Sequence, residues 1–115
     1  MRKPRIYIAG PYTQGDTEAN VKAAIGWAQK ISEMGGNPYI PHLTHYWNAE
    51  HEHSYDFWME YDESWLLTCD AIFRFPGYSP GADKEMQVAE ELGLYIYSDL
   101  KELKKLFTRW GIGKA

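Results

Sequence analysis

Residues 79–85, Ser-Pro-Gly-Ala-Asp-Lys-Glu, combine features that could bind an anion and attack an electrophilic carbon. Serine followed by proline is a strong helix start, because serine caps the first turn and proline fits the first helical position. The first backbone N–H groups of a helix lack partners and attract anions, and Gly81 lets a ligand approach them closely. Glu85 lies about one turn inside, where the positive helix end favours an ionised carboxylate that could act as a nucleophile. An ordinary capped helix, stabilised by its acids, remains the alternative.

Asp62 is a second carboxylate with the features of a catalytic group. It lies in a helical pattern among large apolar side chains, namely Trp58, Tyr61, Trp65 and Leu66. Partial burial there would raise its pKa, and a protonated carboxyl could donate a proton to a leaving group. A solvated helix face is the alternative, because Glu60 and Glu63 are close neighbours. Asp83 does not pair with Glu85, since residues two apart on a helix point to different sides.

Four histidines between His42 and His53 raise the question of a metal site. The spacing of His51-Glu52-His53 lacks the i, i+4 geometry of helical zinc motifs, so no metal is expected. The loop at residues 10–15 is neither a P-loop nor a dinucleotide fingerprint, and no cofactor is expected. The single cysteine, Cys69, is predicted to be a core residue. The histidines and aromatics of this segment fit either recognition of a planar base or a packed surface loop.

Composition and charge exclude several functions. The chain has 115 residues, which fits one domain spanning residues 1–115. A formal net charge of −4 without a basic stripe argues against binding a nucleic-acid polymer but allows a single phosphate. Nine tyrosines and five tryptophans suit a pocket that stacks on a planar ligand. One cysteine, no signal-peptide pattern and no long apolar run predict a cytoplasmic protein that does not enter a membrane.

Strand and helix signals alternate along the chain. Short apolar runs predict strands at residues 5–9, 37–40, 71–75 and 94–97. Helical spacing predicts helices that begin after four capping residues, Asp16, Ser54, Ser79 and Asp99. Residues 41–53 show no periodicity and are expected to be irregular.

This alternation predicts an α/β fold in which a parallel sheet is covered by helices on both faces. In such sheets, ligands bind beyond the carboxyl ends of the strands. The loops at that edge are residues 10–15, 41–53 and 76–81, where glycines, aromatics and histidines gather next to Ser79. The fold and the residue chemistry therefore indicate the same region of the molecule.

Four short motifs follow one another along the chain. They are Ile6-Tyr7-Ile8-Ala9-Gly10-Pro11 after a basic start, Asp62 with Trp65 and Leu66, Cys69-Asp70-Ala71, and Ser79-x-Gly81-x-x-x-Glu85. In this order and spacing they resemble the nucleoside 2-deoxyribosyltransferase-like family, from about residue 5 to residue 97. The resemblance implies a flavodoxin-like or Rossmann-like three-layer sandwich, with a short parallel sheet in the order 2-1-3-4 flanked by helices. It also implies a homodimer or a larger homo-oligomer.

The resemblance implies a role for each matching residue. Glu85 would be the nucleophile that attacks the anomeric carbon, and Asp62 the acid that assists departure of the base. Tyr7 would lie beside the nucleophile. Gly10 matches the close-approach glycine of the first loop, which also contains Pro11.

Ser79 occupies a position, six before Glu85, that separates two subgroups in the resembling family. Transferases of free nucleosides tend to carry an acid there, whereas hydrolases of nucleoside 5′-monophosphates tend to carry a serine that holds phosphate. A capping serine at a helix N-terminus suits phosphate. The first loop departs from the pattern, because relatives that handle phosphate usually have arginine where this chain has residues 12–15, Tyr-Thr-Gln-Gly. Either Lys84 or a partner subunit supplies positive charge, or the ligand is less anionic.

The expected function is hydrolysis of the N-glycosidic bond of a nucleoside or 2′-deoxynucleoside 5′-monophosphate, through a covalent glycosyl-enzyme on Glu85. Phosphate would bind at Ser79, Gly81 and the first loop. The base would lie among the aromatic residues and histidines of the loop and the second helix, namely His42, Tyr46, Trp47 and Trp58. Two alternatives stay open: exchange of bases between nucleosides, and a non-catalytic nucleotide-binding module.

Overall fold

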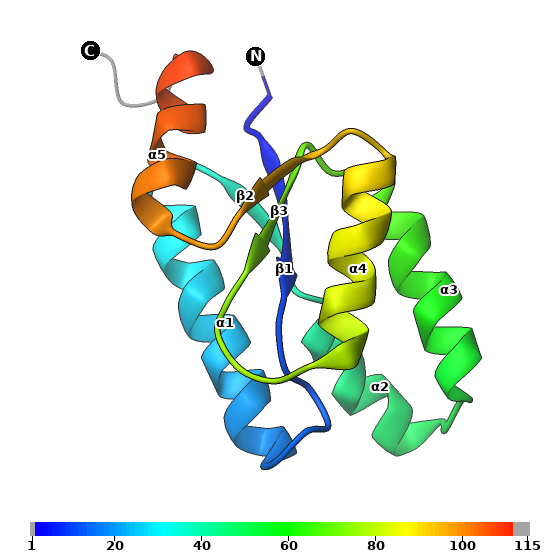
Figure 1. The fold of residues 1–115 in the computed structure, drawn as a ribbon. Coiled ribbons are helices and arrows are strands. Elements are labelled where there is room, and N and C mark those ends of the chain that lie inside the picture. The colour runs from blue at the N-terminus through cyan, green and yellow to red at the C-terminus, as the bar shows by residue number, and fades with distance from the viewer. Residues whose placement is uncertain (1, 112–115) are drawn as a thin grey trace.

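The computed structural model describes residues 2–111, and its centre is a sheet of four parallel strands (Figure 1). The strands are β1 (Arg5–Ala9), β2 (Asn37–Tyr39), β3 (Ala71–Arg74) and β4 (Tyr95–Tyr97). Their order across the sheet is β2-β1-β3-β4, and every neighbouring pair is parallel. The structure therefore confirms the predicted parallel sheet, its strand order and the positions of its strands.

Helices cover both faces of this sheet. They are α1 (Thr17–Glu33), the 3-10 turn η1 (Pro41–Leu43), α2 (Thr44–Glu50), α3 (Tyr55–Leu66), α4 (Pro80–Glu91) and α5 (Leu100–Arg109). Figure 1 shows α1 and α5 on one side of the sheet and α3 and α4 on the other. The predicted three-layer α/β architecture is confirmed. Within residues 2–111, no helix has the length and apolar content needed to cross a membrane.

Side-chain caps begin the helices where the sequence predicts them. The capping oxygens accept hydrogen bonds from backbone N–H groups inside the first turn: Asp16 from Ala19, Ser54 from Phe57, Ser79 from Ala82 and Asp99 from Lys101. Each cap satisfies one N–H group that has no partner within its own helix. The rotational phase of these helices, and so the direction of their side chains, is thereby set close to the cap.

Strand alternation divides the core into two parts. Ile6 and Ile8 of β1 point towards α1 and α5, whereas Tyr7 and Ala9 point towards α3 and α4. Tyr7 is fully buried although its side chain ends in a hydroxyl, so that hydroxyl needs a partner on the α3–α4 side. Cys69 is buried in the same part of the core, as predicted.

Residues 41–53 are the one segment where the expected structure is wrong. Residues 41–50 form η1 and the short helix α2 in place of the expected irregular loop, and residues 51–53 are irregular as predicted. None of the α2 side chains is fully buried, so no apolar period exists for the sequence to reveal. Polar contacts hold this segment instead of buried apolar side chains. The Thr44 hydroxyl donates to the carbonyl of Pro41, and the Asn48 side chain accepts from the Trp58 indole at 2.7 Å.

Candidate active site

A cavity of about 380 Å³ lies beyond the carboxyl ends of the strands, between the first loop, α2, α3 and α4. Its size is typical of small-molecule sites, which measure roughly 300–1,000 Å³. Seven of the residues expected to form a site line it, namely Gly10, His42, Trp58, Asp62, Ser79, Gly81 and Glu85. The cavity therefore lies at the edge of the sheet formed by the carboxyl ends of the strands, where ligands bind in sheets of this kind.

Glu85 of α4 lines this cavity and lies next to Tyr7 of β1. The Tyr7 hydroxyl donates a hydrogen bond to Oε2 of Glu85, which satisfies the buried phenol and fixes the carboxylate. Burial raises the pKa of Glu85 to about 7, while the Tyr7 hydrogen bond and the Arg74 charge oppose that rise. Desolvation is thus the largest influence on Glu85 and opposes the ionised form that the helix N-terminus favours.

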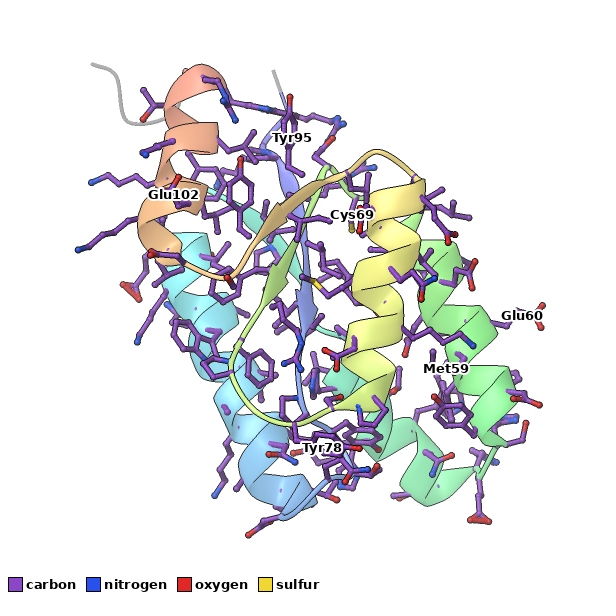
Figure 2. The ribbon with its side chains drawn as sticks, in the orientation of Figure 1. Met59, Glu60, Cys69, Tyr78, Tyr95 and Glu102 are labelled. Carbon is purple, nitrogen blue, oxygen red and sulfur yellow. The ribbon has the colours of Figure 1, made fainter. Side chains whose placement is uncertain are left out.

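Asp62 lines the same cavity from α3. Burial, and then the negative charge of Glu85, raise its pKa to about 8. Its Oδ1 atom is buried and has no hydrogen-bond partner among residues 2–111. The prediction of a partly buried Asp62 with a raised pKa is confirmed. The nearby Glu60 does not indicate the exposure of Asp62, because the two residues lie on different sides of α3. In Figure 2, Met59 lies on the side of α3 that faces α4, whereas Glu60 points outwards.

The two carboxyl groups differ in how strongly their surroundings favour the ionised form. The Tyr7 hydrogen bond and the nearby Arg74 charge favour ionisation of Glu85, and neither acts on Asp62. The negative charge of Glu85 makes ionisation of Asp62 harder, so the surroundings favour the proton on Asp62 over the proton on Glu85. A carboxyl group that favours its proton beside one that favours ionisation is the pairing that splits acid and nucleophile roles in enzymes.

The N-terminus of α4 forms a third side of the cavity. Ser79 is 6% exposed, and its Oγ accepts from the Ala82 N–H at 3.1 Å, which leaves the hydroxyl proton free to bind a ligand. A Cβ atom placed on Gly81 would meet only the Tyr55 hydroxyl, at 3.8 Å, so the space over this backbone belongs to the cavity. A polar ligand group can therefore approach the first N–H groups of α4.

Positive charge near the site comes from a residue that the sequence analysis missed. Arg74, at the carboxyl end of β3, donates to the Gly77 carbonyl at 2.8 Å and to Asp83 at 3.1 Å. It supports the loop before α4 and reaches Glu85 only through its charge. Lys84 is exposed and does not line the cavity, and within residues 2–111 the cavity has no lysine or arginine in its wall. A basic residue among the apolar residues of a predicted strand was the available signal.

Gly10 and Pro11 both have roles in packing and hydrogen bonding within the protein. A Cβ atom on Gly10 would lie 2.2 Å from the ring of Phe75, so glycine is required by packing between β1 and β3 as well as by any ligand. Pro11 does not line the cavity. Its carbonyl accepts from His42 Nε2 at 2.9 Å, so Pro11 holds a cavity residue in place.

The four residues expected around a base are not all together. His42 and Trp58 line the cavity, whereas Tyr46 and Trp47 do not. Trp47 is 41% exposed and packs edge to face against Trp58 from outside, with ring centroids 4.9 Å apart. Thr44 and Asn48, one helical turn apart, are the α2 residues that line the cavity instead.

A hydrogen-bond chain behind the first loop was also missed. Tyr12 lines the cavity, and its hydroxyl lies 3.0 Å from Nδ1 of His45. On the far side of the imidazole, Nε2 lies 2.8 Å from a carboxylate oxygen of Glu18. The Asn20 side chain donates to the carbonyls of Tyr12 and Gln14 and fixes the loop itself. These hydrogen bonds connect α1, α2 and the first loop. No local sequence pattern reveals such a connection.

Comparison with known proteins assigns the chain to a family. Residues 4–98 match a family described as "Domain of unknown function (DUF7768)", which is most of the sequence. The chain belongs to the DUF7768 family. No match was found among curated proteins.

The DUF7768 match contains all four strands and every residue that lines the cavity, while α5 lies beyond it. In the part of this DUF7768 protein that the structure describes, no group of three or more histidine, cysteine or acidic side chains is arranged to hold a metal ion. The acidic side chains that line its cavity are Asp62 and Glu85, and Tyr7 donates to Glu85.

Proposed function

We propose that this protein cleaves the N-glycosidic bond of a nucleoside or a nucleoside 5′-monophosphate through a covalent intermediate on Glu85. The observation that supports the proposal is the pair of half-buried carboxyl groups in one cavity, where the Tyr7 hydrogen bond favours ionised Glu85 and the Glu85 charge favours protonated Asp62. Retaining glycosidases use the same division between a nucleophile and an acid. The resemblance to nucleoside 2-deoxyribosyltransferase-like proteins assigns the same roles to the same two residues.

The proposed reaction has two steps. In the first, a Glu85 oxygen bonds to the anomeric carbon, the bond from that carbon to the base nitrogen breaks, and Asp62 gives its proton to the departing base. In the second, water attacks the anomeric carbon, the ester bond to Glu85 breaks, and ionised Asp62 accepts a proton from the water. Tyr7 holds the Glu85 carboxylate in a fixed orientation, which lowers the entropic cost of attack.

Two observations favour different substrates, a nucleoside 5′-monophosphate and an uncharged nucleoside. The Ser79 hydroxyl and the N-terminus of α4 favour the 5′-monophosphate, the substrate that the resemblance implies. The lack of lysine and arginine in the cavity wall, within residues 2–111, favours an uncharged nucleoside. Trp58 and His42 would contact the base in either case.

We also propose that the protein is a homodimer or larger homo-oligomer that works in the cytoplasm. Large aromatic side chains are exposed on α2 and α3: Tyr46 54%, Trp47 41%, Tyr55 64% and Trp65 44%. A surface of this kind suits an interface, since aromatic residues are enriched there. The unpaired thiol of Cys69 suits a reducing compartment.

Base release decides the proposed function. The purified protein is incubated with ribo- and deoxyribonucleosides and with their 5′-monophosphates, and free base is measured by chromatography. Glu85→Ala is the inactive control. Release that disappears in the variant supports the proposal, and release that persists in it overturns the assigned role of Glu85. Faster incorporation of an added free base than of water would replace hydrolysis by base exchange, and tight binding without release would leave a binding module.

A further inference from the structure

Asn48, one of the two α2 residues that line the cavity, ends in a carboxamide. Its side chain is half-buried, and N–H groups of two other residues of the cavity lining, His53 and Trp58, contact it. A carboxamide donates hydrogen bonds through its nitrogen and accepts them through its oxygen. The orientation of this group therefore determines which hydrogen bonds a ligand can form with Asn48.

Two partners fix the orientation of the Asn48 carboxamide. Its Oδ1 accepts from the indole N–H of Trp58 at 2.7 Å and from the backbone N–H of His53 at 2.9 Å. Both of these groups can only donate, so the atom between them is the oxygen and not the nitrogen. A carbonyl oxygen has two lone pairs, and here two donors occupy them. The oxygen of Asn48 is therefore already satisfied within the protein.

The amide nitrogen of Asn48 remains for a ligand. Nδ2 makes no hydrogen bond within residues 2–111, and it is not one of the buried side-chain atoms without a partner there, which are His42 Nδ1 and Asp62 Oδ1. It is therefore an accessible atom on a side chain that lines the cavity. Because an amide nitrogen only donates, Asn48 offers a ligand a donor and no acceptor.

The proposed chemistry brings the base close to this donor. Asp62 gives its proton to the base, and Trp58 lies about one turn before Asp62 on α3, with both residues in the cavity lining. The Trp58 indole in turn reaches Asn48. A planar base that meets Asp62 at one edge and extends along α3 therefore places a polar group of that edge near Nδ2 of Asn48.

We propose that Asn48 determines the specificity for the base, and that it selects the oxo bases hypoxanthine, guanine, uracil and thymine over the amino bases adenine and cytosine. The two classes differ in the exocyclic group opposite the sugar, which is a carbonyl oxygen or an amino group. A carbonyl oxygen accepts from Nδ2, whereas an amino group would place one donor against another. Asparagine recognises adenine through its oxygen and nitrogen together, and here the oxygen is occupied. The inference rests on the proposed function, because it names the class of base that the same site accepts.

The test compares two pairs of substrates that differ at this exocyclic group, namely inosine with adenosine and uridine with cytidine. Each is supplied as the ribonucleoside, the 2′-deoxyribonucleoside and the two 5′-monophosphates, and kcat/KM is measured from release of the free base. The wild-type protein is expected to prefer the oxo member of each pair by about tenfold or more, because the amino member leaves the amide donor unpaired. Equal kcat/KM within the pairs, or a preference for the amino members, would overturn the inference and leave the glycosidic chemistry intact.

Asn48→Asp exchanges the donor for an acceptor and keeps the two contacts of the oxygen. One carboxylate oxygen can still accept from Trp58 and His53, while the other replaces Nδ2. The ratio of kcat/KM between the oxo and amino members is expected to fall about tenfold or more relative to the wild type. Dividing one ratio by the other cancels the difference between the bases as leaving groups. Asn37→Asp, at the exposed start of β2, adds the same charge and is expected to leave the ratio unaltered.

An unchanged ratio in Asn48→Asp, or the same change in Asn37→Asp, would overturn the role of Asn48, and the wild-type ratio decides the question if Asn48→Asp does not fold. If the wild type releases no base from any substrate, the proposed function fails and binding decides the inference. Calorimetry with the wild-type protein then compares inosine with adenosine and uridine with cytidine. Tighter binding of the oxo members supports the amide donor, and equal, weaker or absent binding of them overturns it.

Discussion

Two parts of the cavity lining differ in how they are built. The helical wall consists of Asp62 and Glu85, which extend from α3 and α4, two helices with side-chain caps. The loop wall consists of Tyr12 and His42, which extend from the first loop and η1 and are held by contacts between segments far apart in the chain. A capped helix sets the directions of its side chains locally, whereas the side chains of the loop wall depend on partners from other segments. The proposed reacting groups thus belong to the helical wall.

Replacing the proposed nucleophile tests the helical wall most severely. Glu85→Gln is expected to lower kcat for base release about a thousandfold or more, because the amide cannot form the glycosyl ester. Glu90→Gln, on the exposed side of the same helix, is the matched control and is expected to keep full activity. Turnover is measured by chromatography of the free base. Activity in Glu85→Gln close to that of the control would remove α4 from the chemistry.

Asp62→Asn removes the proton donor and keeps the shape of the side chain. We expect kcat to fall about a hundredfold or more, with the smallest loss for substrates whose base leaves without protonation. The comparison of good and poor leaving groups is the decisive measurement, because a purely structural role would lower both equally. An equal loss for both classes would contradict the acid role.

The same two carboxyl groups predict how stability changes with pH. Both have a pKa raised by burial, to about 7 for Glu85 and about 8 for Asp62, so the folded state binds their protons more tightly than the unfolded chain. Their contribution to stability is complete below about pH 4, the ordinary range of these acids, and is lost as pH rises through about 7 and 8. Urea unfolding across this range should show a smaller loss for Asp62→Asn. An identical pH dependence would show that Asp62 is not buried as an acid.

Two glycines at the cavity separate packing from ligand approach. Gly10→Ala places a methyl group against the Phe75 ring and is expected to destabilise the protein by roughly 1–3 kcal/mol. Gly81→Ala has open space and a helical position, so the free energy of unfolding should stay the same or rise by up to about 1 kcal/mol while KM increases. Thermal melting and KM are measured together. A Gly81→Ala protein with unchanged KM would place the ligand elsewhere in the cavity.

The smallest effect is expected on the outer face of α2. Tyr46 is 54% exposed and does not line the cavity, so Tyr46→Phe should change kcat/KM by less than about threefold. The equivalent change at Tyr12 serves as the comparison within the same assay. A large loss at Tyr46 would indicate that this surface contributes to the site, for example across an interface between two copies of the chain.

The sequence by itself determined the parallel sheet and the four capped helices, and it singled out Asp62 and Glu85, whereas the strand order followed from the resemblance. These features depend on apolar period and capping, which act within a few residues of each other. The tertiary structure decided the rest. It made α2 from a segment without apolar period, brought Arg74 close to Glu85, and raised the Glu85 pKa against the local effect of its helix. It also joined Tyr12 to His45, 33 positions later, since burial and long-range hydrogen bonds arise only when distant segments meet.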